Sequence, residues 1–273
     1  WLFRSPMYWV LRKQKMIAEI KQEVNTIKPL PGEPVVVIQH LYKSFSDNHV
    51  LVDFTLDLKK GESVVVLGKS GSGKSVLIKC IIGLLRPDKG SIEMFGKNIP
   101  DIKNEELDKI RAKVGFLFQS NALYDSMTVR ENLEFPLRRH WIRVSQEEVN
   151  KMVLEALEDV GLGHTINMMP AELSGGMRKR IALARTLILK PEIILYDEPT
   201  TGLDPITAKE IIDLMIDIQE KYSTSSLIIS HDMNCVRLAS DRVVILVDGK
   251  CYANDTYEQL TKNTDAKVKQ FFE

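Results

Sequence analysis

The chain has 273 residues and carries 37 basic and 37 acidic side chains, so it has no net charge. An even charge balance gives no electrostatic attraction to nucleic acid, which is therefore not an expected partner. No apolar run approaches the roughly 20 residues that a membrane-spanning helix needs, and the three cysteines are too few for a disulfide framework. At 44% hydrophobic residues, the chain can bury a sizeable core as one large or two small domains.

The first 34 residues differ in composition from the rest. Residues 1–28 mix aromatic and basic side chains, which suits a helix lying in a membrane interface. A tag, a translated upstream segment or a helix docked on another subunit would explain the same composition. The chain does not begin with methionine, so Met16 is a candidate natural start. Residues 29–34 contain three prolines and are expected to form a linker.

From residue 35 onward the pattern is that of an α/β protein. Short apolar runs predict strands at 35–38, 54–58, 63–67, 90–96, 114–118, 193–196, 227–229 and 243–247. Residues 120–190 instead carry helical periodicity, with one helix opened by a capping box at Ser145 and Glu148 and stopped by Gly161. Asp248-Gly249 predicts a hairpin after the last strand. We therefore expect an α/β core with a small β layer in front and a helical subdomain inserted at about residues 120–185.

Residues 68–75 match the phosphate-binding loop pattern G-x-x-x-x-G-K-[ST] at every fixed position. The loop follows the predicted strand 63–67 and precedes residues 76–82, an apolar segment expected to be helical. Strand, loop and helix N-terminus together predict a nest of backbone N–H groups that suits a triphosphate. Lys74 would reach the β- and γ-phosphates, and the Ser75 hydroxyl would ligate Mg²⁺. The expected contacts of this loop are Gly68, Ser70, Gly71, Ser72, Gly73, Lys74 and Ser75.

Two adjacent carboxylates end the strand predicted at 193–196. Asp197 at the strand tip is placed to hold the hydration shell of Mg²⁺. Glu198, one residue further, would point differently and could polarise the attacking water as a general base. Many strands end in an acidic turn, so the pair indicates catalysis mainly because a phosphate loop precedes it in the chain.

A second anion site is predicted at residues 174–176. Ser174 is a good helix N-cap, and Gly175 and Gly176 leave backbone N–H groups open in the first turn. A plain cap would explain the serine but not two glycines, which cost helix stability. Because the phosphate loop already cradles one triphosphate, this second site is expected to meet the nucleotide of another copy of the chain.

Over about residues 35–260, the chain resembles the nucleotide-binding subunit of ABC transporters. The resemblance rests on six motifs in order: the phosphate loop, Gln119, Leu-Ser-Gly-Gly at 173–176, Asp197-Glu198, Thr-Gly-Leu-Asp at 201–204 and Ser-His-Asp at 230–232. It implies a RecA-like P-loop NTPase core with an N-terminal antiparallel β subdomain, an inserted α-helical subdomain and a C-terminal tail at 261–273. It also implies ATP hydrolysis, with ATP and Mg²⁺ as ligands.

The family's residue roles transfer to the matching positions. Phe45 matches the aromatic side chain that stacks on adenine, although an ordinary core aromatic would give the same pattern. Gln119 matches the residue that senses Mg²⁺ and the water and that contacts the membrane subunit. His231 matches the histidine that hydrogen-bonds the γ-phosphate, and Asp204 matches the acid of the family's D-loop. The signature residues Ser174, Gly175 and Gly176 match those that contact ATP across a dimer.

Finer details resemble one branch of the family, the ATPases of Mce/Mla-type lipid transport systems. Met177 stands where the commonest signature has Gln, and the segments 118–129 and 196–206 are similar to that branch. The branch implies phospholipid transport between the two membranes of diderm bacteria. It implies as partners a second copy of the chain, a permease dimer and an Mce-domain lipid-binding subunit. The expected location is peripheral, on the cytoplasmic face of the inner membrane.

Three other functions share some of these motifs. An importer ATPase for amino acids or another small solute has the same motifs. A non-transport ABC protein usually carries two cassettes or a long coiled-coil insert, and neither is present in this sequence. A binding module with an inactive site is disfavoured, since Lys74, Asp197, Glu198 and His231 are all intact.

Overall fold

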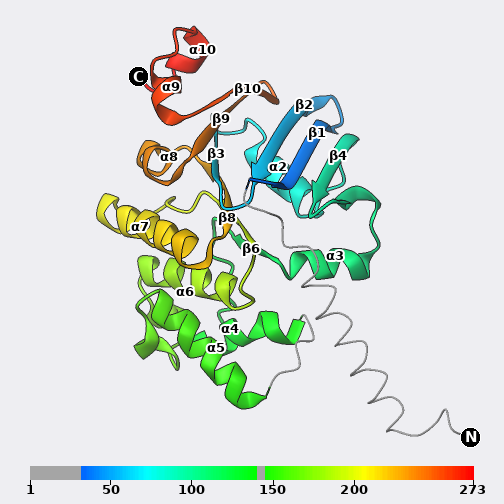
Figure 1. Cartoon of the computed structure of the whole chain (residues 1–273). Helices are drawn as coiled ribbons and strands as arrows, with labels where there is room; N and C mark the ends of the chain where they lie inside the picture. The colour runs from blue at the N-terminus through cyan, green and yellow to red at the C-terminus, as the bar shows by residue number, and fades with distance from the viewer. Residues whose placement is uncertain (1–31, 140–144) are drawn as a thin grey trace, which may run out of the picture.

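The computed structural model describes residues 32–139 and 145–273 (Figure 1). The proposed interfacial segment 1–28, the candidate start Met16 and linker residues 29–31 lie outside the described residues. In the described part, no helix has the length and apolar character that crossing a membrane requires.

A small antiparallel sheet forms the N-terminal layer, with strand order β2-β1-β4-β5. Its strands are β1 (Pro34–Phe45), β2 (Asn48–Lys59), β4 (Lys89–Met94) and β5 (Lys97–Asn98). The strands predicted at 35–38 and 54–58 were too short, because irregular pairing between Ile38 and Leu41 breaks the alternation of buried and exposed residues. Pro34, expected in the linker, instead begins β1, a position where its missing N–H is tolerated.

The central sheet has the order β10-β9-β3-β8-β7-β6. Its strands are β3 (Ser63–Leu67), β6 (Val114–Leu117), β7 (Ile193–Asp197), β8 (Ser225–Ser230), β9 (Arg242–Val247) and β10 (Lys250–Asp255). All neighbours are parallel except β9 and β10, which form the predicted hairpin. Asp248 and Gly249 both have positive φ in its turn, as a two-residue hairpin of this kind requires. The residues of β3, β7 and β8 are all buried, so the continuous apolar runs did indicate covered strands.

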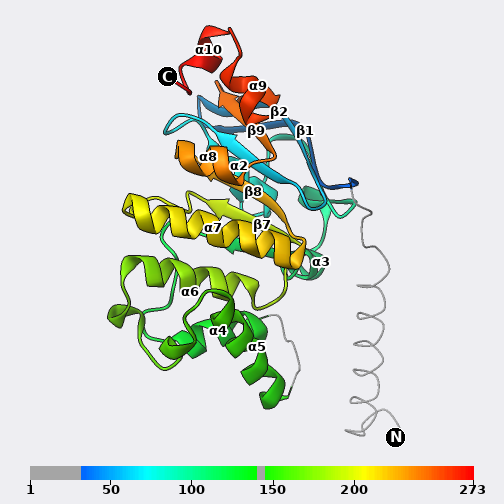
Figure 2. The ribbon, with the colours of Figure 1, turned by 60° about the vertical axis from the view of Figure 1, so that its left-hand side comes forward.

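Helices cover the central sheet and form an additional layer beyond it (Figure 2). They are α2 (Lys74–Ile81), α3 (Asn104–Arg111), α4 (Val129–Arg139), α5 (Gln146–Asp159), α6 (Gly175–Leu187), α7 (Pro205–Tyr222), α8 (Met233–Ala239), α9 (Tyr257–Thr261) and α10 (Ala266–Lys269), with short 3-10 turns at Ile99–Asp101, Gly163–Thr165 and Pro170–Glu172. The capping box of Ser145 and Glu148 opens α5 as predicted. Figure 1 shows α4, α5 and α6 grouped at one end of the molecule and α9 and α10 at the other.

Alternate residues of the central strands enter two separate apolar cores. Val64 and Val66 of β3 pack with the small sheet, α2 and α3. Val65 and Leu67 pack with α6, α7, α8 and the helical group around α4 and α5. The sheet is therefore fixed on both faces, which holds the loops that follow β3, β6, β7 and β8 at one edge.

Candidate functional site

The phosphate loop connects β3 to α2 in the predicted manner. Gly73 is the N-cap of α2 and has φ 103°. A Cβ at this position would lie 2.8 Å from Val50 Cγ1, so both the backbone and the packing require glycine there. Gly71 also has positive φ, at 77°. The glycines of the motif therefore allow a tight loop to lie against β2.

Lys74 is a buried cation at the centre of the loop. Its side chain is 7% exposed, and Nζ donates hydrogen bonds to the backbone oxygens of Gly68, at 2.7 Å, and Lys69, at 3.1 Å. Glu198 Oε1 lies 3.8 Å from the same nitrogen. Burial lowers the pKa of Lys74, while the charges of Glu198 and Asp197 oppose that shift.

The two carboxylates differ in position although they are adjacent in sequence. Asp197 is the last residue of β7, and its Oδ1 accepts a hydrogen bond from Ser75 Oγ at 3.4 Å. Burial, and secondarily the charge of Glu198, raises the pKa of Asp197. Glu198 has a left-handed backbone, with φ 51°, and its N–H donates to Ile229 O at 2.9 Å. A strained non-glycine residue of this kind is typical of functional sites.

His231 follows β8 and meets Glu198. Its Nδ1 lies 2.8 Å from Glu198 Oε2. Thr201 Oγ1 donates to the same oxygen at 3.4 Å, a contact that no sequence motif predicted. Glu198 thus lies between the Lys74 ammonium on one side and the His231 ring on the other.

Six of the twelve residues predicted to contact ATP line one cavity of about 510 Å³, which we call the phosphate-loop cavity, together with Gln119, Glu198 and His231. Phe45 lies at its wall, with 46% of its surface exposed and Lys43 Nζ 5.4 Å from the ring centroid. Gln119 is exposed and lies in the turn after β6. The cavity is lined by Phe45, Val50, Ser70, Gly71, Gly73, Lys74, Ser75, Val76, Gln119, Glu198 and His231.

The phosphate loop also borders a neighbouring cavity. Ser72 lines it with residues of β2, β9, the turn after β9 and the C-terminal helix α10, and its Oγ is buried without a hydrogen-bond partner among the described residues. Gly68 packs closely against the Ser72 side chain, since a Cβ on Gly68 would lie 2.6 Å from Ser72 Oγ.

The signature residues line a separate cavity of about 440 Å³, which we call the signature cavity. Ser174 caps α6 and accepts a hydrogen bond from Met177 N at 3.2 Å. Asp204 caps α7 and accepts bonds from the backbone N–H and, at 2.6 Å, the hydroxyl of Thr207, and the hydroxyl bond is the first of the causes that lower the pKa of Asp204. Ser174, Gly175, Gly176 and Asp204 therefore lie together, and none of them lines the phosphate-loop cavity.

The glycines of the signature are not equivalent. A Cβ on Gly176 would lie 2.7 Å from Thr207 Cγ2, so close packing of α6 against α7 already requires glycine there. A Cβ on Gly175 would meet nothing within 4 Å. The sequence-based prediction explained both glycines by an anion site and did not include this packing reason for Gly176.

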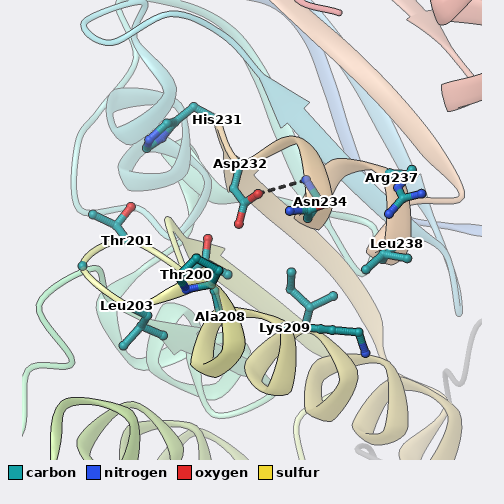
Figure 3. Close-up of a pocket in the computed structure, with 13 residues that line it drawn as sticks. Thr200, Thr201, Leu203, Ala208, Lys209, His231, Asp232, Asn234, Arg237 and Leu238 are labelled. Atoms are coloured by element: carbon teal, nitrogen blue, oxygen red, sulfur yellow. Dashed lines mark hydrogen bonds between the residues drawn. The ribbon is translucent and has the colours of Figure 1, made fainter.

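A third cavity, of about 440 Å³, opens between α7 and α8 on the other side of His231. Figure 3 shows His231 and Thr201 at one end and Arg237 and Leu238 at the other. Asp232, which caps α8, also lines this cavity and accepts a hydrogen bond from Asn234 N at 2.9 Å. His231 is therefore shared by two cavities.

No three His, Cys, Asp or Glu side chains within residues 32–139 and 145–273 gather closely enough to hold a metal ion by themselves. Ser75 Oγ and Asp197 Oδ1 nevertheless form a close pair of oxygen donors. That pair suits Mg²⁺, which usually takes one or two protein ligands and completes its shell with water and substrate phosphates.

Comparisons with known proteins agree with this geometry. The ABC transporter family model matches residues 51–201, just over half of the chain. A probable ribonucleotide transport ATP-binding protein, mkl, of Mycobacterium leprae is 40% identical, over 89% of this chain and 70% of that protein. The intermembrane phospholipid transport ATP-binding protein MlaF of Haemophilus influenzae is 37% identical, over 88% of this chain and 90% of that protein.

Two further likenesses extend the comparison. A methionine import ATP-binding protein, MetN, of Campylobacter jejuni is 34% identical, over 87% of this chain and 75% of that protein. The solved dimer of an ATP-binding cassette in a post-hydrolysis state, bound to ADP and Pi, has a TM-score of 0.74 and 34% identity, over 81% of this chain and 98% of that one. These findings confirm the predicted P-loop fold and the predicted ATP hydrolysis. The chain belongs to the ABC transporter family, as an ATPase subunit of the kind that includes mkl and MlaF.

Proposed function

We propose that two copies of the chain bind head to tail and enclose two ATP molecules. Each composite site joins the phosphate-loop cavity of one copy to the signature cavity of the other. The observation that carries this proposal is the separation of the predicted ATP contacts into two cavities of one chain. The solved relative that the fold resembles is also a dimer.

Within each site, the residues of the phosphate-loop cavity perform the chemistry. Ser75 and Asp197 hold Mg²⁺ with Gln119 nearby, and the ion, when bound, neutralises charge on the phosphates. Glu198 orients the attacking water and accepts its proton, since it is the carboxylate that faces the cavity. His231 keeps the Glu198 side chain in place through their 2.8 Å contact and also faces the phosphate position. Phe45 offers an exposed ring for the adenine.

The dimer drives a membrane permease, which contacts the chain beside the helical subdomain. Two exposed aromatic side chains support this position, since Phe118 is 37% and Tyr124 is 42% exposed on the segment that also carries Gln119. Tyr124 packs on Phe135 of α4, with ring centroids 4.7 Å apart. A partner bound there would touch both the helical subdomain and the segment that leads into the nucleotide cavity.

The transported substrate is a phospholipid, moved between inner and outer membranes by an Mce/Mla-type system. Support comes from the likeness to MlaF, which covers nine-tenths of that protein. The chain would then lie on the cytoplasmic face of the inner membrane, with the permease dimer and an Mce-domain subunit as partners. The likeness to a methionine importer favours the alternative, an ATPase for a small solute.

Purification from native membranes distinguishes these substrates. The subunit is isolated in mild detergent, and mass spectrometry identifies the proteins and lipids that accompany it, with an untagged strain as control. A permease, an Mce-domain protein and enriched phospholipid would support the lipid system. A different permease with a periplasmic binding protein, and no enriched lipid, would leave the ATPase mechanism intact and overturn the substrate proposal.

A further inference from the structure

One face of α6 is bound to the segment that carries Gln119. Three side chains of this helix donate hydrogen bonds to main-chain oxygens of residues 116–122. Lys179 Nζ donates to Gln119 O at 3.0 Å, and Thr186 Oγ1 donates to Phe116 O at 3.3 Å. Arg185 forms two bonds, from Nη1 to Ala122 O at 2.8 Å and from Nη2 to Asn121 O at 3.0 Å. Side chains of α6, the helix that begins at the signature, are therefore hydrogen-bonded to the main chain of residues 116–122 at several points.

Lys179 is unusual for a helix side chain because only 2% of its surface is exposed. Burial lowers its pKa to about 8, while the charge of Asp197 acts in the opposite direction. Burying an ammonium group destabilises the fold unless the group is hydrogen-bonded or paired. The bond to Gln119 O therefore compensates for the burial of Lys179 Nζ. Burial also lowers the pKa of Arg185.

The segment that these cations hold has a strained backbone. Asn121 and Ala122 both have positive φ, at 63° and 51°, although neither is glycine. Asn121 Oδ1 is buried and accepts no hydrogen bond from any described residue. Asn121 N makes one local bond, to Phe118 O at 3.1 Å, and the two bonds from Arg185 fall on the two strained residues.

We propose that Lys179 and Arg185 are positioning residues that hold residues 119–122 in this strained conformation and so keep Gln119 in the phosphate-loop cavity. Because α6 begins at the signature, a displacement of this helix moves the main chain of Gln119 with it. The signature bound to one nucleotide is in this way coupled to the Gln119 that serves the other. This inference rests on the proposed placement of Gln119 at the Mg²⁺ and water.

Arg185→Lys and Lys179→Met test the inference. Lysine at 185 keeps the charge but cannot form both bonds with the same fork geometry, and methionine at 179 keeps the length but loses the donor. We expect kcat to fall about tenfold or more, as for a misplaced catalytic group, while KM for ATP stays within about twofold. The matched control is Lys190→Met, which removes an exposed ion pair with Glu155 just after α6 and should leave both constants near their wild-type values.

A second substitution separates positioning from simple packing. Ala122→Gly relieves the left-handed strain, because glycine adopts positive φ without steric cost. In the Arg185→Lys background it should restore kcat several-fold, whereas in the wild type it should change kcat little, a non-additive result. Hydrogen exchange of residues 117–124 should be faster in Arg185→Lys and not in Lys190→Met.

The outcomes are distinguishable from those that test the proposed function. If the wild type releases phosphate but Lys179→Met and Arg185→Lys match the Lys190→Met control, the positioning inference is overturned and the composite site stands. Equal effects of Ala122→Gly in both backgrounds would also overturn it. If Gln119→Ala alone leaves wild-type turnover, the placement of Gln119 fails, and the inference fails with it.

Discussion

The phosphate-loop cavity and the signature cavity are built in contrasting ways. The first lies at the tips of parallel strands and holds buried charges, since Lys74 and Glu198, 3.8 Å apart, and the neighbouring Asp197 are each less than 9% exposed. The second lies at the N-termini of α6 and α7, and its predicted ATP contacts are the exposed Ser174, Gly175 and Asp204 and the half-buried Gly176. Buried charges must find partners inside the fold, whereas exposed backbone N–H groups at a helix start are free for an outside anion.

The difference explains why one chain carries both. The phosphate-loop cavity contains the proposed base Glu198 with Lys74 and His231, and two of its lining residues, Phe45 and Gln119, are exposed. The signature cavity has backbone donors for a phosphate, and the two acids that line it are engaged elsewhere, Asp204 as a helix cap and Glu210 in an ion pair with Arg180. In the proposed head-to-tail pair, each cavity supplies what the other lacks.

The largest expected effect is a loss of ATP hydrolysis with ATP binding retained, from a substitution at Glu198 in the phosphate-loop cavity. Glu198→Gln keeps the shape of the side chain and removes its basicity, so kcat should fall about 10²–10⁴-fold. ATP binding should persist, and the ATP-bound dimer should accumulate. Phosphate release measures the rate, and size-exclusion chromatography with ATP measures the dimer. Turnover at the wild-type rate would remove Glu198 as the base.

A smaller effect is expected at Lys74. Lys74→Ala removes the cation that we propose faces the β- and γ-phosphates, and loss of charge-assisted bonds should weaken ATP binding about tenfold to a hundredfold. Titration with a fluorescent ATP analogue measures the affinity. Lys97→Ala, which removes only an exposed ion pair with Glu106, is the control. Unchanged affinity in Lys74→Ala would contradict the assignment of the loop.

The signature glycines offer a test of the second cavity that works through stability. Gly176→Ala places a methyl group against Thr207, whose hydroxyl is bound to Asp204 and cannot rotate freely, so we expect a loss of about 1–3 kcal/mol. Gly175→Ala meets no atom of the chain and should raise stability by up to about 0.5–1 kcal/mol. Urea unfolding measures both.

The two variants should nevertheless agree in activity. Both place a side chain where the partner's nucleotide is proposed to bind, so both should lower ATP turnover. Only Gly176→Ala should also lower the unfolding midpoint. Normal turnover in the more stable Gly175→Ala would show that the signature cavity is not part of a composite site.

The sequence predicted the phosphate-loop cavity better than the connections around it. A glycine loop between a buried strand and a helix is a local pattern, and the acids that end β7 are read from the run that precedes them. The lengths of β1 and β2 were not predictable, because bulges interrupt their alternation. The roles predicted for Phe45, Gln119, Asp204 and His231 came from family motifs rather than from residue spacing.

Lys179 and Arg185 show the limit of such reasoning. A lysine or arginine within a helical pattern is normally solvated, so its sequence position gives no signal of burial. Their bonds to residues 119–122 depend on how α6 packs beside the end of β6, about 60 residues earlier in the chain. The left-handed backbone of Ala122 is equally hidden, because alanine carries no preference for it.

The smallest predicted effect concerns Asp204, whose pKa is shifted in the opposite direction from that of Asp197. Hydrogen bonds from Thr207 hold the pKa of Asp204 below its ordinary value, whereas burial raises that of Asp197. A carboxylate with a depressed folded-state pKa stabilises the fold above its unfolded pKa of about 3.9, and this contribution disappears as pH falls through the folded value. Asp204→Asn keeps a capping side chain but does not titrate. The unfolding free energy of the wild type should therefore decline relative to that of Asp204→Asn below about pH 4. Urea unfolding between neutral pH and pH 3 measures the unfolding free energy of both proteins. Parallel curves of this free energy against pH would mean that the cap does not depend on the charge of Asp204. The contrast between the two cavities would then rest on burial alone.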